Sequence, residues 1–266
     1  MRFISLAATA ALTFVSAVAS ASNSGVVRLL DPAGIADVRY YDALAGDTQL
    51  VLEVTDADLS GTIEVLVSTA LSGDVELLTL TETGVGTGVF RVTVPLDVGV
   101  LMVDDNGRLE VEHGDLIEVE YDDASDAFGN PKVFLDQAYF VTGATSGELT
   151  ADTTWTAGAS PYLVTGDVRV PLGMKLTIAA GTEVLVMPSD RHDLGGDTTR
   201  VEFFVKGTLE TQGTNADPVI LRSASLIPNR GDWYGFRPGG RTATVTLAGT
   251  MVSDANIIFN ADGGIG

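Results

Sequence analysis

The sequence predicts an all-β protein, and three observations carry this prediction. Apolar residues make up 45% of the 266 residues, which is enough to bury a sizeable core. Short runs rich in β-branched residues recur after residue 25, and Gly, Asp, Asn and Ser bound them. Beyond the first 25 residues, no stretch of about twelve residues shows the apolar stripe of an amphipathic helix.

The N-terminus carries the pattern of a secretory signal peptide. Arg2 is followed by a run from Ile4 to Ala19 without any charge, and small residues end the run in two overlapping A-x-A sites. This run is too short and too weakly apolar to favour a membrane anchor, and no second long apolar run follows it. Residues 1–21 are therefore predicted to be a signal peptide. The mature chain is expected to lack a transmembrane segment and to be exported, either outside the cell, to the cell surface or outer membrane, or to the periplasm.

The charge balance excludes several classes of function. The chain has 36 acidic and 15 basic residues, which gives a formal net charge of −21. Nucleic-acid binding needs a basic face, and docking on an anionic membrane needs one as well. Cations, calcium above all, are the expected small partners. The absence of cysteine excludes disulfides and thiol nucleophiles.

A stretch of small residues at 142–147 indicates a boundary between two β domains, at residues 22–145 and 146–266. In the upstream domain, the run from Val75 to Phe90 predicts a hairpin, because its three glycines can supply the positive φ angles of the connection. The strand lengths and turn spacing there favour a β-sandwich.

Three runs in the upstream domain, VTDADLS, LTLTETGVGTGVF and GDLIEVEYDD, resemble Ig-like β-sandwich repeats of large exported bacterial surface proteins. The resemblance covers about residues 26–142. It implies a structural or adhesive module that binds a surface protein or an extracellular polysaccharide.

Clustered aspartates in this domain are candidate calcium ligands, because calcium takes six to eight oxygens with several carboxylates per site. None of the runs matches the full EF-hand pattern. The alternative is turn chemistry, since Asp, Asn and Gly are common turn formers. The candidates are Asp56, Asp58, Asp104, Asp105 and Asp115.

In the downstream domain, short strands return at a spacing of about 30 residues, which predicts a solenoid of about four turns. Thr177, Val205 and Gly235 are expected to occupy equivalent positions in successive turns. The run from Ala261 to Gly266 contains no obvious cap, so the solenoid is expected to be incomplete at its C-terminal end.

The runs DTTWTAGASPYLVTGDVRVPLGMKLTIAAGTEVLV, KGTLETQGTNADPVILRSAS and GDWYGF resemble the first turns of right-handed parallel β-helix regions in exported bacterial proteins. The resemblance covers about residues 148–236, and PSDRHDLGGDTT reads as a loop inserted between turns. Because parallel β-helices include pectate lyases and polysaccharide hydrolases, the resemblance also implies an alternative, a carbohydrate-binding or polysaccharide-degrading protein. Trp233 could stack on a sugar, but its place in the fold signature favours core packing.

The inserted loop holds the most suggestive polar cluster of the chain. Its candidate ligand-binding residues are His192, Asp193 and Asp197, with Asp190 close by. The loop could hold a cation, or it could be an ordinary solvated loop. No nucleophile elbow, zinc-protease motif or P-loop is present. The sequence therefore favours a structural or adhesive protein without catalytic activity.

Overall fold

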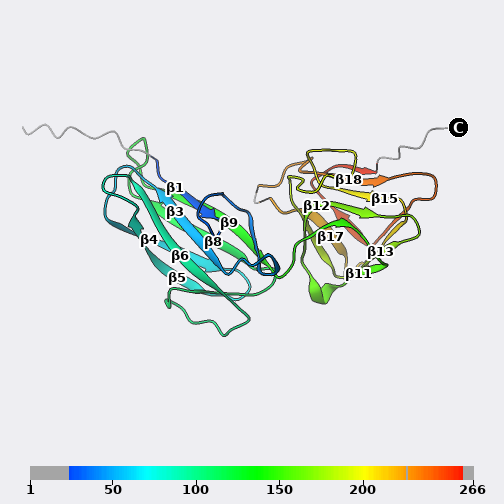
Figure 1. Cartoon of the computed structure of the whole chain (residues 1–266), viewed down its shortest axis with the longest axis horizontal. Coiled ribbons are helices and arrows are strands. Elements are labelled where there is room, and N and C mark those ends of the chain that lie inside the picture. The colour runs from blue at the N-terminus through cyan, green and yellow to red at the C-terminus, as the bar shows by residue number, and fades with distance from the viewer. Residues whose placement is uncertain (1–23, 226, 260–266) are drawn as a thin grey trace, which may run out of the picture.

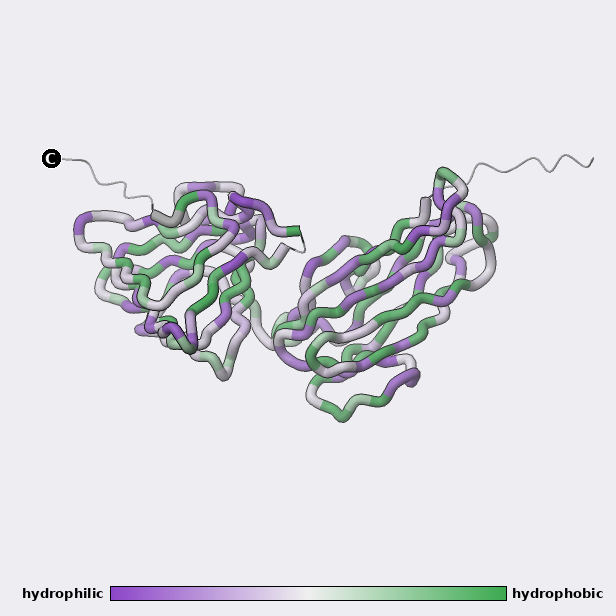
Figure 2. The backbone as a smooth tube through the Cα atoms, turned by 180° about the vertical axis from the view of Figure 1, so that it is seen from behind, coloured by the Kyte–Doolittle hydropathy of each residue, from purple (hydrophilic) through white to green (hydrophobic). Residues whose placement is uncertain are grey.

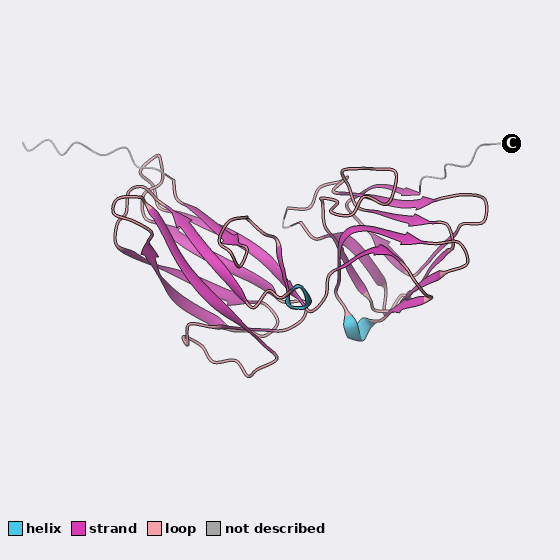
Figure 3. Ribbon diagram, viewed as in Figure 1, coloured by secondary structure: helices cyan, strands magenta, loops and turns pink. Residues whose placement is uncertain are grey.

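The computed structural model describes residues 24–225 and 227–259, and strands dominate this part of the chain (Figure 3). The predicted signal peptide, residues 1–21, lies outside the described residues, as do residues 260–266. Among the described residues, the two helices have three residues each, and none could reach across a bilayer. The prediction of an all-β chain is confirmed.

Nine strands and one short 3-10 helix, η1 (Ala43–Ala45), form the upstream domain (Figure 1). The strands are β1 (Val26–Leu30), β2 (Tyr40–Asp42), β3 (Gln49–Thr55), β4 (Thr62–Thr69), β5 (Val75–Glu82), β6 (Val89–Val98), β7 (Leu109–Val111), β8 (Leu116–Asp123) and β9 (Lys132–Val141).

These strands make one continuous sheet in the order β1-β3-β6-β5-β4-β8-β9-β2, and β7 pairs with β6. The predicted hairpin is present, since Glu82 of β5 pairs with Phe90 of β6 in antiparallel register. The Ig-like sandwich, which has two separate facing sheets, is not confirmed. Alternating apolar residues mark the inner face of a sandwich and of a curled sheet equally, so the pattern alone does not separate the two.

The sheet curls until β1 lies beside β9, and carboxylates of β8 and β9 accept hydrogen bonds from the backbone of β1 and of Gly25 just before it. Leu29 N–H donates to Asp136 Oδ2 at 2.7 Å, and Gly25 N–H donates to Asp123 Oδ2 at 2.8 Å. Inside the curl, alternate residues of the strands form one buried apolar cluster. Figure 2 shows the resulting alternation of hydrophobic and hydrophilic residues along the chain. These side-chain bonds, together with the backbone bond from Val38 N–H to Leu29 O at 3.0 Å, close the sheet where no ladder joins the described strands β1 and β9.

The downstream domain consists of parallel strands and a second 3-10 helix, η2 (Ala157–Ala159). The strands are β10 (Thr145–Glu148), β11 (Thr153–Trp155), β12 (Tyr162–Val170), β13 (Lys175–Ala179), β14 (Glu183–Val186), β15 (Glu202–Val205), β16 (Thr208–Gln212), β17 (Val219–Ser223), β18 (Trp233–Pro238), β19 (Thr244–Ala248), β20 (Thr250–Val252) and β21 (Ala255–Phe259).

Their pairing defines a three-sided parallel β-helix of four rungs among the described residues. One face is β11-β13-β16-β19, and the long strand β12 connects the other two, β14-β17-β20 on one side and β15-β18-β21 on the other. Strand β10 lies against β12 before the first full rung. The predicted solenoid and its four turns are confirmed. The inserted loop is present, but it lies within a rung, between β14 and β15, and not between turns.

The predicted repeat position is wrong for Thr177, whereas Val205 and Gly235 lie on the same face in the paired strands β15 and β18. Thr177 lies in β13 and pairs with Glu210, whereas Val205 lies on another face, in β15, and pairs with Pro238. In-register residues such as Leu176 and Leu209 are 33 positions apart, because each rung contains three strands. The short strands β13 and β15 of one rung look alike in sequence. The spacing of about 30 residues therefore matched two strands that lie on different faces.

Aromatic residues stack through the interior of the β-helix. Phe203 and Phe236 occupy matched positions on β15 and β18 with ring centroids 5.4 Å apart, and both are fully buried. Trp233 has no exposed surface, so its expected core packing is confirmed. Trp155 stacks on Tyr162 at 4.8 Å in the first rung, where large rings cover the aliphatic core.

The two domains share a small apolar junction. Tyr139 and Val141 at the end of β9 belong to the same buried cluster as Leu163, Leu185 and Met187 of the β-helix. Polar contacts flank this cluster. One of them is a hydrogen bond between the ring of His113 and Pro161 O at 3.0 Å. Arg191 also lies over the ring of Tyr40, at 5.3 Å from its centroid. The inserted loop is therefore anchored on the upstream domain.

Candidate functional site

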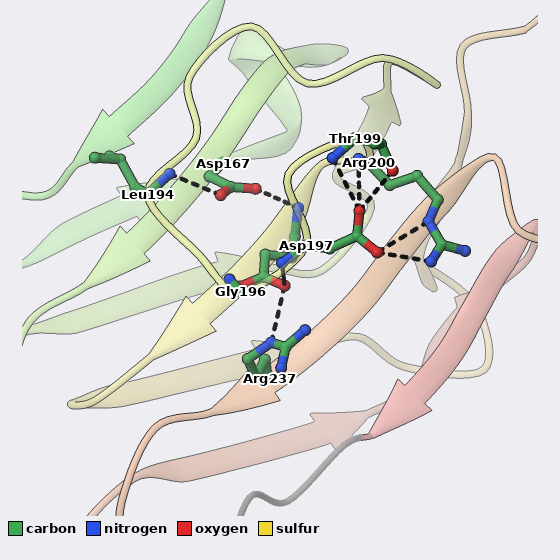
Figure 4. A network of polar contacts seen from close by, with 8 residues as sticks. Asp167, Leu194, Gly196, Asp197, Thr199, Arg200 and Arg237 are labelled. Atoms are coloured by element: carbon green, nitrogen blue, oxygen red, sulfur yellow. Dashed lines mark hydrogen bonds and ion pairs between the residues drawn. The ribbon is translucent and has the colours of Figure 1, made fainter.

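The most polar part of the β-helix is the inserted loop, residues 187–201, between β14 and β15. The loop interrupts the regular rung and crosses the outer side of β12, where Asp167 lies between two apolar segments of the strand. Figure 4 shows the contacts that hold it, with carboxylates receiving hydrogen bonds from the loop backbone. A loop without regular structure needs such partners for its buried N–H groups.

Asp167 is the buried centre of this network and has no exposed surface. Its Oδ1 accepts from Glu202 N–H at 2.7 Å, and its Oδ2 accepts from Leu194 N–H at 2.9 Å. Burial raises the pKa of Asp167 to about 7, although these two hydrogen bonds act in the opposite direction. The charge of nearby Asp190 contributes to the increase in the pKa. Asp167 therefore titrates near neutral pH.

Asp190 and Asp193 complete a group of three carboxylates with Asp167. One oxygen from each residue lies within 4.8 Å of the other two. Asp190 Oδ1 accepts from His192 N–H at 2.8 Å, whereas Asp190 Oδ2 is buried and has no hydrogen-bond partner among the described residues. Asp193 is exposed at the surface of the loop. Three carboxylates at this separation suit a hard divalent cation, which would supply the missing partner of Asp190.

The sequence candidates of this loop have different roles. Asp193 belongs to the carboxylate group, but Asp197 does not. Burial opposes ionisation of Asp197, yet hydrogen bonds from Arg200 and Thr199 lower its pKa overall. Arg200 Nη2 lies 2.6 Å from Asp197 Oδ2. Asp197 therefore fixes the end of the loop as a paired anion.

His192 contributes mainly through its backbone. Its carbonyl oxygen accepts from Asp167 N–H at 3.3 Å, and its N–H donates to Asp190. The exposed ring places Nδ1 3.4 Å from the hydroxyl of Ser146. No described contact joins the His192 ring to the carboxylate group.

The five upstream calcium candidates are not brought together by the fold. The one group of three carboxylates found among the described residues is the one in the β-helix. Asp56 is buried and accepts from Tyr121 OH at 2.5 Å and from Asp58 N–H at 3.0 Å. The contact with Asp58 fits the turn chemistry that stood as the alternative, whereas the contact with Tyr121 joins residues 65 positions apart.

Asp115 is a second structural anchor. It has no exposed surface, and its Oδ1 accepts from Leu71 N–H at 2.6 Å while its Oδ2 accepts from Glu112 N–H at 2.8 Å. Asp104 and Asp105 lie exposed in a different loop, where Asp105 Oδ1 accepts from Leu77 N–H at 3.2 Å. Asp115 and Asp105 therefore bind backbone N–H groups of neighbouring segments.

Two residues central to this network, Asp167 and Glu202, were not among the sequence candidates. Asp167 carries a signal that could have found it, because it is the one acidic residue of the mostly apolar strand β12. Glu202 is the first residue of strand β15, directly before the apolar run Phe203-Phe204-Val205. A charged residue at the start of a strand is ordinarily exposed to solvent. The burial of Glu202 results from the loop that folds over it.

Comparisons with known proteins bear on the downstream domain. No curated protein matches the chain. Residues 147–264, less than half of the sequence, match the family of pectate-lyase-like β-helix domains, so this part of the chain is similar to that family and its three-sided stack of parallel strands agrees with it.

Proposed function

We propose that this chain is a rigid, non-catalytic structural or adhesive module of an exported protein, either secreted or held at the cell surface. The upstream domain then serves as the Ig-like spacer of a bacterial surface protein, and the β-helix, taken as right-handed, presents its loops to a partner. The observation that carries the proposal is the use of the loop carboxylates. Asp167, Asp197 and Glu202 each accept backbone N–H groups and hold the loop in place.

The two tryptophans support the same function. A sugar-stacking platform needs an exposed ring, but Trp155 is 4% exposed and Trp233 is 0% exposed. Both tryptophans serve the core. The apolar junction between the domains and the contact of Arg191 with Tyr40 support a fixed arrangement of the two modules. Fixed geometry lowers the entropy cost of binding a partner with several loops at once.

A polysaccharide-binding or polysaccharide-degrading protein is the second candidate. The match of residues 147–264 to pectate-lyase-like β-helix domains favours it. The group of Asp167, Asp190 and Asp193 favours it as well, because a cation held there could bind the carboxylates of an acidic polysaccharide.

Turnover separates the two candidates. The full chain is incubated with acidic and neutral polysaccharides in the presence of calcium, and new chain ends are measured together with binding by affinity electrophoresis. We expect retention by a polysaccharide or no interaction, and no new chain ends. Cleavage that Asp193→Asn abolishes would overturn the non-catalytic proposal. The matched control is Asp217→Asn, because Asp217 is an exposed aspartate of the same domain outside the group.

A further inference from the structure

A histidine lies at the joint between the two domains. The domains meet over a narrow region (Figure 1), and His113 lies there, in the turn between β7 and β8. Its Nδ1 accepts from Thr142 N–H at 2.9 Å, and its Nε2 lies 3.0 Å from Pro161 O. Thr142 begins the segment 142–144 between β9 and β10, here called the connector. One imidazole of the upstream domain therefore binds both the connector and the β-helix.

The two partners of His113 fix the protonation state of its ring. A backbone N–H can only donate, so Nδ1 must be without a proton to accept from Thr142. A carbonyl oxygen can only accept, so Nε2 must carry a proton to bind Pro161 O. The arrangement therefore requires the neutral imidazole, in the form that has its proton on Nε2.

A second proton on the ring would break the contact with the connector. Nδ1 would then be a donor and would face Thr142 N–H, which is a donor as well. The hydroxyl of Thr142, 3.1 Å from Nδ1, can rotate and accept from the charged ring, but the backbone N–H cannot. Imidazole is the side chain that ordinarily changes its charge between about pH 5 and pH 8. Acid therefore deprives the connector of its acceptor.

The joint has room for the ring and the connector to move. A cavity with a volume of about 400 Å³ lies beside His113 and extends to Tyr162 of the β-helix. The connector contains Gly143, whose φ of +142° is accessible to glycine, and hinges are short segments that absorb such changes in φ and ψ. The turn packs closely on the β-helix, since a Cβ at Gly114 would lie 2.5 Å from the ring of Pro161. A moving connector would therefore change how the two domains meet.

We propose that His113 is a pH-sensitive latch between the two domains. The neutral ring holds the connector and the β-helix in the fixed arrangement, and the protonated ring releases the connector at Thr142. The apolar side chains of Val141, Leu163 and Met187 do not titrate, so the domains stay together and only the range of their orientations grows. This inference goes beyond the proposed function, because a binding module and an enzyme could both use such a joint.

The other titratable groups around the latch bind backbone N–H groups or face solvent, and no described contact joins any of them to the ring. They are Glu112 and Asp115 on the same turn, Asp74 on the adjoining turn, Asp42 beside the connector and Tyr162 of β12. Residues 142–147 and 157–161 contain no charged side chain. Burial raises the pKa of Asp74, and Asp167 titrates near neutral pH, so the experiment must separate both from His113.

Distances between two spin labels test the proposal on the full chain. The chain has no cysteine, so two introduced cysteines can be labelled selectively. Val85→Cys in the upstream domain and Ala216→Cys in the β-helix are both at exposed positions. Pulsed EPR measures the distance distribution at about pH 7.5 and about pH 5.5, and circular dichroism confirms that the strands persist in acid. We expect the distribution to become about twofold wider at the lower pH, because the hinge then samples more orientations.

Variants of the ring separate the latch from the other titrating groups. His113→Asn places an amide oxygen on the same carbon that carries Nδ1, and this oxygen accepts at both pH values, so the width should no longer depend on pH. His113→Lys places a permanent donor there and should give the wide distribution at both pH values. His192→Asn, at the other histidine of the chain, is the control and should respond to acid like the unmodified chain.

Nitrogen NMR of the unmodified chain gives a readout that needs no variant. Nδ1 of His113 should be unprotonated at neutral pH, and the amide signal of Thr142 should shift together with the ring as it titrates. A protonated Nδ1 at neutral pH would contradict the latch. An equally narrow distance distribution at both pH values in the unmodified chain, or broadening in acid that persists in His113→Asn, would overturn the proposal.

Discussion

Arg237 Nε lies 2.9 Å from Glu202 Oε2, and this ion pair links two successive rungs of the β-helix. Glu202 has no exposed surface, and the Arg237 side chain is 12% exposed. The same carboxylate accepts Gly196 N–H at 2.6 Å, so it also fastens the inserted loop to the rungs. The pair therefore contributes to the stability of the β-helix and also fixes the geometry of the inserted loop.

Removing one partner of this pair should be costly. Glu202→Ala leaves the guanidinium of Arg237 and the N–H of Gly196 without their acceptor, and breaking a buried pair costs about 3–5 kcal/mol. Urea unfolding measures the loss. The control is Glu210→Ala, because Glu210 pairs with Lys175 at the surface, where such pairs contribute about 0–1 kcal/mol. Equal losses for the two variants would contradict a buried role for Glu202.

Phe203 and Phe204 offer a neighbouring pair that tests the inner face of the β-helix. Phe203 is fully buried among aromatic rings, whereas Phe204 points outward, where Arg169 and Lys206 lie over its ring. Phe203→Ala should destabilise the domain by about 3–5 kcal/mol through the cavity that it leaves. Phe204→Ala should cost clearly less in the same urea titration. A larger loss of stability for Phe204→Ala than for Phe203→Ala would contradict the placement of Phe203 on the inner face of β15.

The raised pKa of Asp167 predicts a pH dependence of stability with a defined sign. The pKa is 3.8 for an ordinary aspartate and about 7 in the folded chain, so the folded state binds more protons between these values. The stabilisation by protonated Asp167 is fully present below the unfolded pKa and is lost as the pH rises through about 7. Carboxyl NMR should find the Asp167 midpoint near neutral pH. Asp190→Asn should lower that midpoint, because the charge of Asp190 raises it; an unchanged midpoint would argue against their coupling.

Calcium should bind the carboxylate group of Asp167, Asp190 and Asp193 and raise the melting temperature, because a ligand of the native state stabilises it. The binding should weaken below neutral pH, where a proton competes for Asp167. Differential scanning calorimetry with calcium and with a chelator measures the shift. Asp193→Asn should remove the shift and Asp217→Asn should keep it. Identical melting curves in calcium and in chelator would rule out the site.

Local chemistry explains what the sequence alone could predict. The glycines and threonines between Val75 and Phe90 predicted a hairpin because turn geometry depends on the residues in the turn. Trp233 could be assigned to the core from the pattern around it, and its complete burial agrees. Alternation located the inner faces of the strands, but it could not show whether the upstream sheet closes on itself, since closure at Asp136 joins residues 107 positions apart.

The carboxylate group depends on contacts that local sequence cannot encode. Asp167 lies 23 positions before Asp190, and the two residues meet because the loop folds back over the strand of the preceding rung. The same three-dimensional stacking explains the error in the repeat. Thr177 and Val205 lie in similar short strands, yet only the ladder assigns them to different faces. Positions on one strand were therefore predictable, and positions brought together by stacking were not.

Gly88 provides a sharp test of the upstream hairpin. Its φ is +62°, and a Cβ there would lie 2.7 Å from the backbone of Ala57, so Gly88→Ala should combine backbone strain with a clash. The control is Gly86→Ala, because Gly86 also has a positive φ, +70°, but no atom lies within 4 Å of its Cβ position. Gly86→Ala should cost about 1–2 kcal/mol from conformation alone, and Gly88→Ala should cost clearly more in urea unfolding. The difference between the two variants measures the close approach of the hairpin to the turn at Asp56, whose N–H donates to Gly88 O at 2.7 Å. Equal costs would mean that the two segments do not touch.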